Sequence, residues 1–204
     1  MRIKICGLHP TRDVQFCINL GVSFLGFVFY EKSPRNLNLK DIQYLKNYNK
    51  KSSNFVAVTV NPSNEFIKKI VLNNFDFIQL HGSETKERVA EIKSMGLKII
   101  KAIKVKDELD IENYKKYDEA DFILFDTPGM EKSIKFPKDL ISKLPLGNRF
   151  ALAGAISKEN IEYIMKLGVT FCDLSSSLEL DKKLGYKDHQ KIKKFINVVN
   201  ELKN

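Results

Sequence analysis

Residues 55–82 read FVAVTVNPSNEFIKKIVLNNFDFIQLHG, and this stretch contains the unit from which the fold is built. Two runs rich in β-branched and aromatic residues, FVAVTV (55–60) and FDFIQL (75–80), flank a segment (64–74) whose apolar residues recur at helical spacing. The two runs are almost continuously hydrophobic, as is typical of parallel strands covered on both faces. The stretch therefore predicts a strand, a helix and a second strand parallel to the first.

The same alternation extends along the whole chain. The predicted strands are RIKIC (2–6), FLGFVF (24–29), FVAVTV (55–60), FDFIQL (75–80), KIIKAI (98–103), DFILFD (121–126), FALAG (150–154) and FCDLSS (171–176). The other predicted helices are TRDVQFCINLG (11–21), KERVAEIKSMG (86–96), KENIEYIMKLG (158–168) and YKDHQKIKKFINVVNELK (186–203). The first three of these helical segments end in glycine, the residue that commonly caps a last helical turn.

Eight strands alternating with helices predict an α/β fold, a (β/α)8 TIM barrel with short loops. The 204 residues give about 25 residues to each unit, which is compact for this fold. We expect residues 1–204 to form one catalytic domain, because no linker or low-complexity tract interrupts them. A doubly wound open sheet is the alternative, which the strand count and the absence of a glycine-rich turn after the first strand disfavour.

The composition is that of a globular protein, with 43% hydrophobic and 29% charged residues. The longest apolar run, VSFLGFVFY (22–30), has the length of a strand and not of a membrane span. We expect no secretory signal, because no apolar segment follows a charged start. The three cysteines, Cys6, Cys17 and Cys172, fit neither a disulfide framework nor a zinc site. These features predict a cytoplasmic protein with no bound metal.

The net charge of +9 has two interpretations. The lysines fall singly on predicted helix faces, which indicates a solvated surface, but a positive potential also attracts a phosphorylated substrate or a nucleic acid. No helix-turn-helix, zinc-finger or RNA-recognition signature is present. We therefore expect a small phosphorylated molecule as the partner, and neither nucleic acid nor membrane.

A barrel carries its chemistry at the carboxyl ends of its strands. Asp126 ends a very apolar strand, where desolvation raises the pKa of a carboxyl group and suits it to act as a general acid. A turn-forming aspartate before Thr-Pro-Gly explains the same pattern equally well. Cys6 ends the first strand, with Lys4 on the same face. Taken alone, Cys6 is best interpreted as a small buried hydrophobe, but a thiol facing a carboxyl across the barrel mouth suits proton transfer.

Other strand ends suggest binding groups. The small residues after the seventh and eighth strands, Gly154, Ala155, Ser175 and Ser176, leave backbone N–H groups accessible to a phosphate, although ordinary tight turns have similar sequences. Arg35 in KSPRN (32–36) is either a bidentate partner for a carboxylate or a surface arginine. His81 either contacts substrate or is satisfied by nearby backbone.

The ordered blocks KICG, LGFVFYEKSPR, VAVTVN, FIQLHGSE, KAI, FDT, ALAG, DLSSSLE and GYKDHQKIKKFI resemble the phosphoribosylanthranilate isomerase family of tryptophan biosynthesis. The resemblance runs from residue 2 to about residue 196. It implies a (β/α)8 barrel, a monomer or a homodimer, that needs no cofactor. It also implies conversion of N-(5′-phosphoribosyl)anthranilate into 1-(2-carboxyphenylamino)-1-deoxyribulose 5-phosphate, an Amadori rearrangement catalysed by an aldose–ketose isomerase.

The resemblance assigns roles to individual residues. Cys6 matches the general base, Asp126 the general acid, Arg35 the arginine that holds the anthranilate carboxylate, and Asp173 a strand-eight acid near the sugar hydroxyls. The implied mechanism is protonation of the ring oxygen, ring opening to a Schiff base, and removal of the C2 proton. Only a modest base is then required, because the iminium acidifies C2.

The chain departs from the family pattern after each of its last three strands. The usual double glycine after the seventh strand is Gly154-Ala155, and the usual SSG of the eighth is SSS (175–177). A glycine-rich GGTGK-type segment usually follows the sixth strand, whereas this chain has TPGMEKSIKFPKDL (127–140). We expect the lysines of this segment, Lys132, Lys135 and Lys138, to supply long-range attraction while the phosphate stays on the turns after the last two strands.

The rival functions are isomerisation of another aminoaldose phosphate, a non-catalytic phosphate-binding barrel, and nucleic-acid binding. Cys6 argues against the histidine-pathway isomerase, for which an aspartate is expected at that position.

Overall fold

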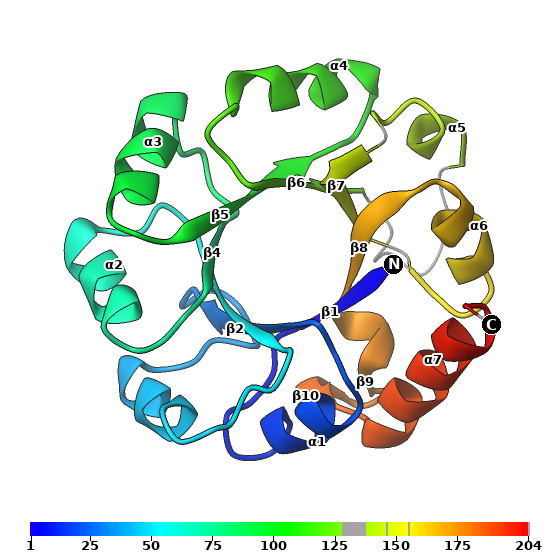
Figure 1. The fold of residues 1–204 in the computed structure, drawn as a ribbon, viewed down its shortest axis with the longest axis horizontal. Coiled ribbons are helices and arrows are strands. Elements are labelled where there is room, and N and C mark those ends of the chain that lie inside the picture. Colours follow the sequence, from blue (N-terminus) through cyan, green and yellow to red (C-terminus); the bar gives the residue numbers. More distant parts are fainter. Residues whose placement is uncertain (128–137, 146, 155, 204) are drawn as a thin grey trace.

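The computed structural model describes residues 1–127, 138–145, 147–154 and 156–203. Within these residues, eight parallel strands form a closed barrel in which each strand pairs with the next and β8 pairs with β1 (Figure 1). The strands are β1 (Arg2–Cys6), β2 (Phe24–Phe29), β3 (Asn54–Thr59), β4 (Phe77–Leu80), β5 (Lys98–Lys104), β6 (Phe122–Asp126), β7 (Gly147–Ala153) and β8 (Val169–Leu174). The predicted fold class is confirmed.

Helices surround the barrel (Figure 1). The α-helices are α1 (Val14–Asn19), α2 (Asn64–Val71), α3 (Lys86–Ser94), α4 (Glu108–Ile111), α5 (Lys138–Ile141), α6 (Ile161–Lys166) and α7 (His189–Glu201). The 3₁₀ helices are η1 (Leu39–Leu45), η2 (Glu112–Lys116) and η3 (Ser176–Leu178). None of the helices in the described part of the chain is long and apolar enough to cross a membrane.

The segment after β8 differs from the prediction. Residues 186–188 were expected to begin the last helix, but β10 (Lys183–Lys187) pairs there with β9 (Glu179–Leu180) in a small antiparallel sheet. The helix α7 begins only at His189, because the side chain of Asp188 accepts hydrogen bonds from two backbone N–H groups of its first turn. Aspartate is favoured at this capping position and not inside the helix.

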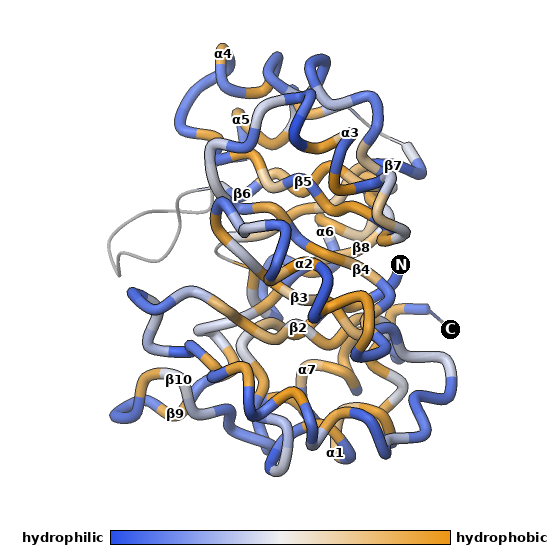
Figure 2. The backbone as a smooth tube through the Cα atoms, turned by 90° about the vertical axis from the view of Figure 1, so that its left-hand side faces the viewer, coloured by the Kyte–Doolittle hydropathy of each residue, from blue (hydrophilic) through white to orange (hydrophobic). Residues whose placement is uncertain are grey.

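The core has two layers. Inside the barrel, four aromatic rings from β2, β4, β6 and β8 pack on one another, with Phe24 and Phe77 at a centroid distance of 5.5 Å. Outside it, the apolar faces of the helices pack on the strands. Figure 2 shows hydrophobic stretches on the strands and hydrophilic ones on the outer loops. Aromatic packing fills the interior of the barrel, so the open space lies at one end.

Candidate active site

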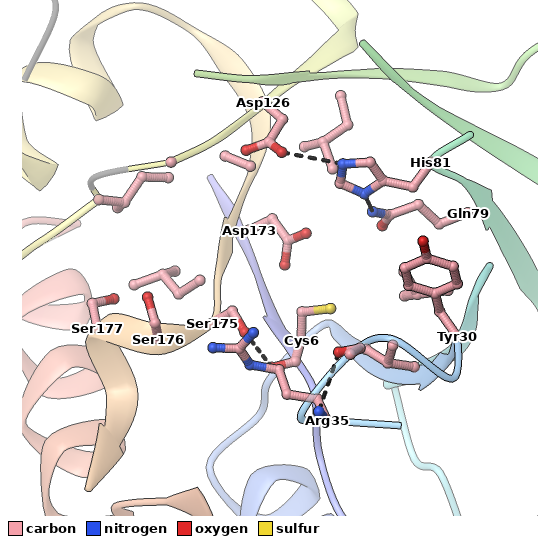
Figure 3. A pocket seen from close by; sticks show the side chains of 18 of the residues that line it. Cys6, Tyr30, Arg35, Gln79, His81, Asp126, Asp173, Ser175, Ser176 and Ser177 are labelled. Atoms are coloured by element: carbon pink, nitrogen blue, oxygen red, sulfur yellow. Dashed lines mark hydrogen bonds and ion pairs between the residues drawn. The ribbon is translucent and has the colours of Figure 1, made fainter. Parts of the chain in front are cut away.

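A pocket of about 850 Å³ lies at the carboxyl ends of the strands (Figure 3). Every described residue that the sequence predicted for the site lines it. These residues are Cys6, Arg35, His81, Asp126, Gly154, Asp173, Ser175 and Ser176. Ala155, also predicted, lies outside the described residues. The barrel therefore brings together side chains that are up to 170 positions apart in the chain, from Cys6 to Ser176.

Asp126 lies at the end of β6, where its carboxylate is 3.2 Å from Nε2 of His81. The other ring nitrogen of His81, Nδ1, lies 3.4 Å from the side-chain nitrogen of Gln79. If the amide donates to Nδ1, the imidazole proton is on Nε2 and is donated to Asp126. The sequence analysis did not predict Gln79 as a site residue. Gln79 lies on β4 two residues before His81, and this spacing places the two side chains on the same face.

Cys6 lies across the pocket from Asp126, with Asp173 between the two, and its Sγ points into the pocket (Figure 3). Burial raises the pKa of the Cys6 thiol, whereas the ammonium groups of Lys4 and Lys187 lower it. Desolvation is the larger effect, so the thiol form is favoured at neutral pH. A thiolate formed there is correspondingly a stronger base.

Asp173 on β8 has two carboxylate oxygens in different situations. Oδ2 accepts a hydrogen bond from Nζ of Lys4 at 2.7 Å, and the lysine is fully buried. Oδ1 is buried and has no hydrogen-bond partner among the described residues. A buried acceptor without a partner is costly, and a hydroxyl group of a bound ligand would satisfy it.

Arg35 follows β2 and pairs with Glu179. Nε and Nη2 of its guanidinium donate to the two carboxylate oxygens at 2.6 and 2.9 Å. Lys187 donates to the same carboxylate at 2.9 Å. Gly7, directly after Cys6, makes room for this arrangement, since a Cβ there would lie 2.4 Å from Cδ of Arg35. Sequence reasoning missed Glu179 and Lys187, because no local pattern pairs either residue with Arg35.

The turns after β7 and β8 close one side of the pocket. Gly154 has φ of +89°, and a Cβ there would lie 2.0 Å from the backbone oxygen of Thr127. Only glycine fits this position without displacing the backbone. Ser175 donates its hydroxyl to the backbone oxygen of Cys6 at 3.1 Å, which joins the end of β8 to the end of β1.

A buried ion pair between Lys101 and Glu84 anchors the loop after β4. Nζ of Lys101 lies 2.9 Å from the carboxylate of Glu84, and it also donates to the backbone oxygens of Leu80 and Gly82. Glu84 in turn accepts hydrogen bonds from the backbone N–H groups of Asn61 and Gly82. These contacts fix the loop that begins with His81.

Of the lysines expected to attract substrate, Lys132 and Lys135 lie outside the described residues. Lys138 begins α5, and its ammonium lies 5.4 Å from the ring centroid of Tyr163. Within the described residues, no cluster of three or more histidine, cysteine, aspartate or glutamate side chains is arranged to hold a metal ion.

The closed parallel barrel and the pocket with ionisable side chains at its carboxyl end are the features of a (β/α)8-barrel enzyme. The sequence profile of the family described as N-(5'-phosphoribosyl)anthranilate (PRA) isomerase matches residues 3–198. The chain belongs to this family.

Individual relatives agree with this assignment over nearly their full lengths. An N-(5'-phosphoribosyl)anthranilate isomerase from Petrotoga mobilis is 37% identical over 100% of this chain and 99% of its own. The crystal structure of phosphoribosyl anthranilate isomerase from Thermotoga maritima superposes with a TM-score of 0.85 at 30% identity, covering 98% of this chain and 99% of that one. Another structure of the enzyme, in complex with reduced 1-(o-carboxyphenylamino)-1-deoxyribulose 5-phosphate, has a TM-score of 0.81 at 29% identity, with 98% and 99% covered.

Proposed function

We propose that this protein catalyses the isomerisation of N-(5′-phosphoribosyl)anthranilate to 1-(2-carboxyphenylamino)-1-deoxyribulose 5-phosphate in tryptophan biosynthesis. The observation that carries the proposal is the placement of Cys6 and Asp126 on opposite sides of one pocket, with Asp173 between them (Figure 3). Two groups with different proton affinities across a pocket suit an acid–base isomerisation. Membership of the isomerase family supports the same reaction.

Asp126 acts first, as the general acid that protonates the furanose ring oxygen. The ring then opens, and a Schiff base forms at C1 of the sugar. Asp126 must be protonated for this step, and its contact with His81 offers a route for the proton because the imidazole shares a hydrogen bond with the carboxyl group. The side chains of Asp126 and His81 are both partly exposed to the pocket, so water resupplies the proton.

Cys6 acts second, as the general base. Its thiolate removes the proton from C2, the electron pair moves into the C1–C2 bond, and the nitrogen of the Schiff base becomes neutral. The enolamine then tautomerises to the ketone. Cys6 is thus a base and forms no covalent bond with the substrate, which agrees with its position beside a sugar-binding carboxylate and not beside a histidine that would activate a nucleophile.

The remaining residues hold the two ends of the substrate. Nε and Nη2 of Arg35 are engaged by Glu179, so the second edge of the guanidinium, formed by Nη1 and Nη2, binds the anthranilate carboxylate. The partnerless Oδ1 of Asp173 accepts a hydrogen bond from a sugar hydroxyl. Gly154 and the turn that contains Ser175 and Ser176 bind the phosphate, because they follow β7 and β8 at the carboxyl end of the barrel and line the pocket.

Further properties follow from the same proposal. Residues 1–204 act as one catalytic domain in the cytoplasm, without a cofactor and with no nucleic-acid partner. The enzyme works as a monomer or a homodimer, and a phosphoribosylanthranilate isomerase from Thermotoga maritima is described as dimeric. Sedimentation velocity of the purified chain distinguishes the two states.

Complementation of a tryptophan auxotroph that lacks this isomerase tests the function, together with turnover of the purified protein. We expect growth without tryptophan and measurable turnover of phosphoribosylanthranilate. Failure of both, combined with binding of sugar phosphates, would favour a non-catalytic phosphate-binding barrel. Preferential turnover of the related histidine-pathway aminoaldose would indicate that the protein is the histidine-pathway isomerase instead.

A further inference from the structure

Lys4 is a fully buried lysine that the reaction, as described, does not use. Its side chain has 0% exposure, and its ammonium donates to Oδ2 of Asp173 at 2.7 Å. Phe24, its pairing partner on β2, belongs to the apolar cluster that fills the barrel interior. A buried ion pair in such surroundings rarely stabilises a fold more than apolar side chains of the same volume. Stability alone therefore gives a weak reason for a lysine at this position.

The ammonium of Lys4 lies beside the thiol of Cys6. The two residues are separated by one position on β1, so their side chains point into the barrel on the same side. Gly26 on β2 pairs with Cys6. A Cβ added to Gly26 would lie 3.1 Å from Sγ of Cys6 and 3.2 Å from Nζ of Lys4. Because residue 26 is a glycine, Sγ of Cys6 and Nζ of Lys4 both border the space that a side chain would occupy there.

The charged groups around Cys6 come from three elements. Lys4 on β1 and Lys187 on β10 are cations, and Asp173 on β8 is an anion. Burial alone would lower the pKa of Lys4, but Asp173 and Cys6 together raise it, so Lys4 keeps its proton. Burial lowers the pKa of Lys187, which shares its ammonium between Glu179 and Ser175. Of the two cations, Lys4 is the one whose ammonium borders the same space beside Gly26 as Sγ of Cys6.

We propose that Lys4 is a positioning residue whose ammonium, held by Asp173, stabilises the thiolate of Cys6. The thiol form predominates, the thiolate forms when the thiol proton leaves to water in the pocket, and Lys4 remains an ammonium throughout. When substrate is bound, the thiolate takes the C2 proton and becomes a thiol again. Asp173 thus has two functions, since Oδ2 orients Lys4 while Oδ1 faces the ligand. The catalytic part of this inference rests on the proposed function, whereas the stabilised thiolate does not.

The titration of Cys6 tests the inference without substrate. The rate of alkylation by iodoacetamide is measured across pH, and the peptide containing Cys6 is quantified by mass spectrometry. Only the thiolate reacts, so Lys4→Met should slow alkylation of Cys6 at pH 8 by roughly tenfold or more, the effect of removing a neighbouring opposite charge. Lys4→Gln keeps a donor for Asp173 without the charge, and it should slow the reaction similarly if Lys4→Met fails to fold.

The matched control is Lys50→Met, which removes a lysine from its ion pair with Asp76 near the amino end of β3. It should leave the alkylation profile of Cys6 unchanged. An unchanged profile in folded Lys4→Gln would overturn the inference. The pH dependence of kcat/KM adds a catalytic readout, whose rising limb should move to higher pH in Lys4→Gln. If alkylation slows but the wild-type protein does not turn over phosphoribosylanthranilate, the proposed function fails and the stabilised thiolate stands.

Discussion

Cys6 differs from the other two cysteines in its surroundings. All three are free and buried, and burial raises the pKa of Cys17 to about 12 and that of Cys172 still further. Cys6 alone of the three lines the pocket, where it faces the ammonium groups of Lys4 and Lys187. The sequence RIKICG placed this thiol at the end of a strand but gave no measure of its proton affinity, which depends on charges from β8 and β10.

Arg35→Ala should weaken binding of the anthranilate-bearing substrate far more than binding of ribulose 5-phosphate, because only the former has a carboxylate for the guanidinium. The loss should be about 10- to 100-fold in KM, the usual size of a lost charged hydrogen-bonded pair. The KM of the substrate and the inhibition constant of ribulose 5-phosphate as a competitive inhibitor measure the two effects. Arg88→Ala, which removes an arginine on the outer helix α3, is the control. Equal weakening for both ligands would indicate a general charge effect in place of a carboxylate clamp.

At the scale of elements, strands were predicted better than the connections between them. The runs at residues 2–6 and 24–29 match β1 and β2 at both ends, because buried parallel strands are continuous apolar runs. The strand β7 begins at Gly147, three residues before the predicted start. Arg149 there donates to the backbone of the segment before β6, and this tertiary contact has no local signal.

The small sheet of β9 and β10 was missed for a similar reason. Its strands are short and expose Leu180 and Leu184, so no hydrophobic period marks them. Their contribution is Glu179 and Lys187, which complete the surroundings of Arg35. The sequence could therefore predict the pocket residues at strand ends, but not the network that orients one of them.

The turn after β7 makes a prediction about stability. Gly154→Ala and Gly96→Ala both place a side chain at positive φ, +89° and +97°, but only Gly154 faces a backbone oxygen at 2.0 Å. Gly96→Ala should cost about 1–2 kcal/mol in the free energy of unfolding. Gly154→Ala should cost roughly 1–3 kcal/mol more, because the backbone must shift. Urea denaturation of both variants measures the difference, and equal costs would contradict the close approach seen here.

The Glu179 network predicts how stability depends on pH. Burial would raise the pKa of Glu179, but hydrogen bonds from Arg35 and Lys187 lower it to about 2. Because the folded-state pKa is depressed, the stabilisation is complete above the unfolded pKa near 4.5 and is lost as pH falls toward 2. The full shift corresponds to about 3 kcal/mol at pH 7.

Glu179→Gln removes this dependence. The difference in unfolding free energy between wild type and variant should be largest at neutral pH and should shrink as the pH falls from 4.5 toward 2. Chemical denaturation across that interval measures it. Glu65→Gln, at an exposed position on α2, is the control and should show little difference at any pH. A constant difference for Glu179→Gln across the interval would contradict the assigned network.

At the scale of the whole molecule, the net charge of +9 should draw the anionic substrate toward the pocket. Raising the salt concentration from about 0.05 to about 0.5 M shortens the range of this attraction more than it weakens buried contacts. We expect KM to rise noticeably and kcat to change little. Steady-state kinetics across a salt series decides the matter. A salt-independent KM, or a kcat that falls with added salt, would show that the surface lysines do not gather substrate.

The central claim is that Cys6 and Asp126 are the base and acid of one isomerisation, and single-site variants measure this most directly. Steady-state turnover of phosphoribosylanthranilate should fall about 10²- to 10⁴-fold in both Cys6→Ala and Asp126→Asn, the usual contribution of a general acid or base. Both variants should keep the circular dichroism spectrum of the wild type. Cys17→Ala, which changes a cysteine inside α1, should retain nearly full turnover. Near-wild-type turnover in either Cys6→Ala or Asp126→Asn would contradict the account.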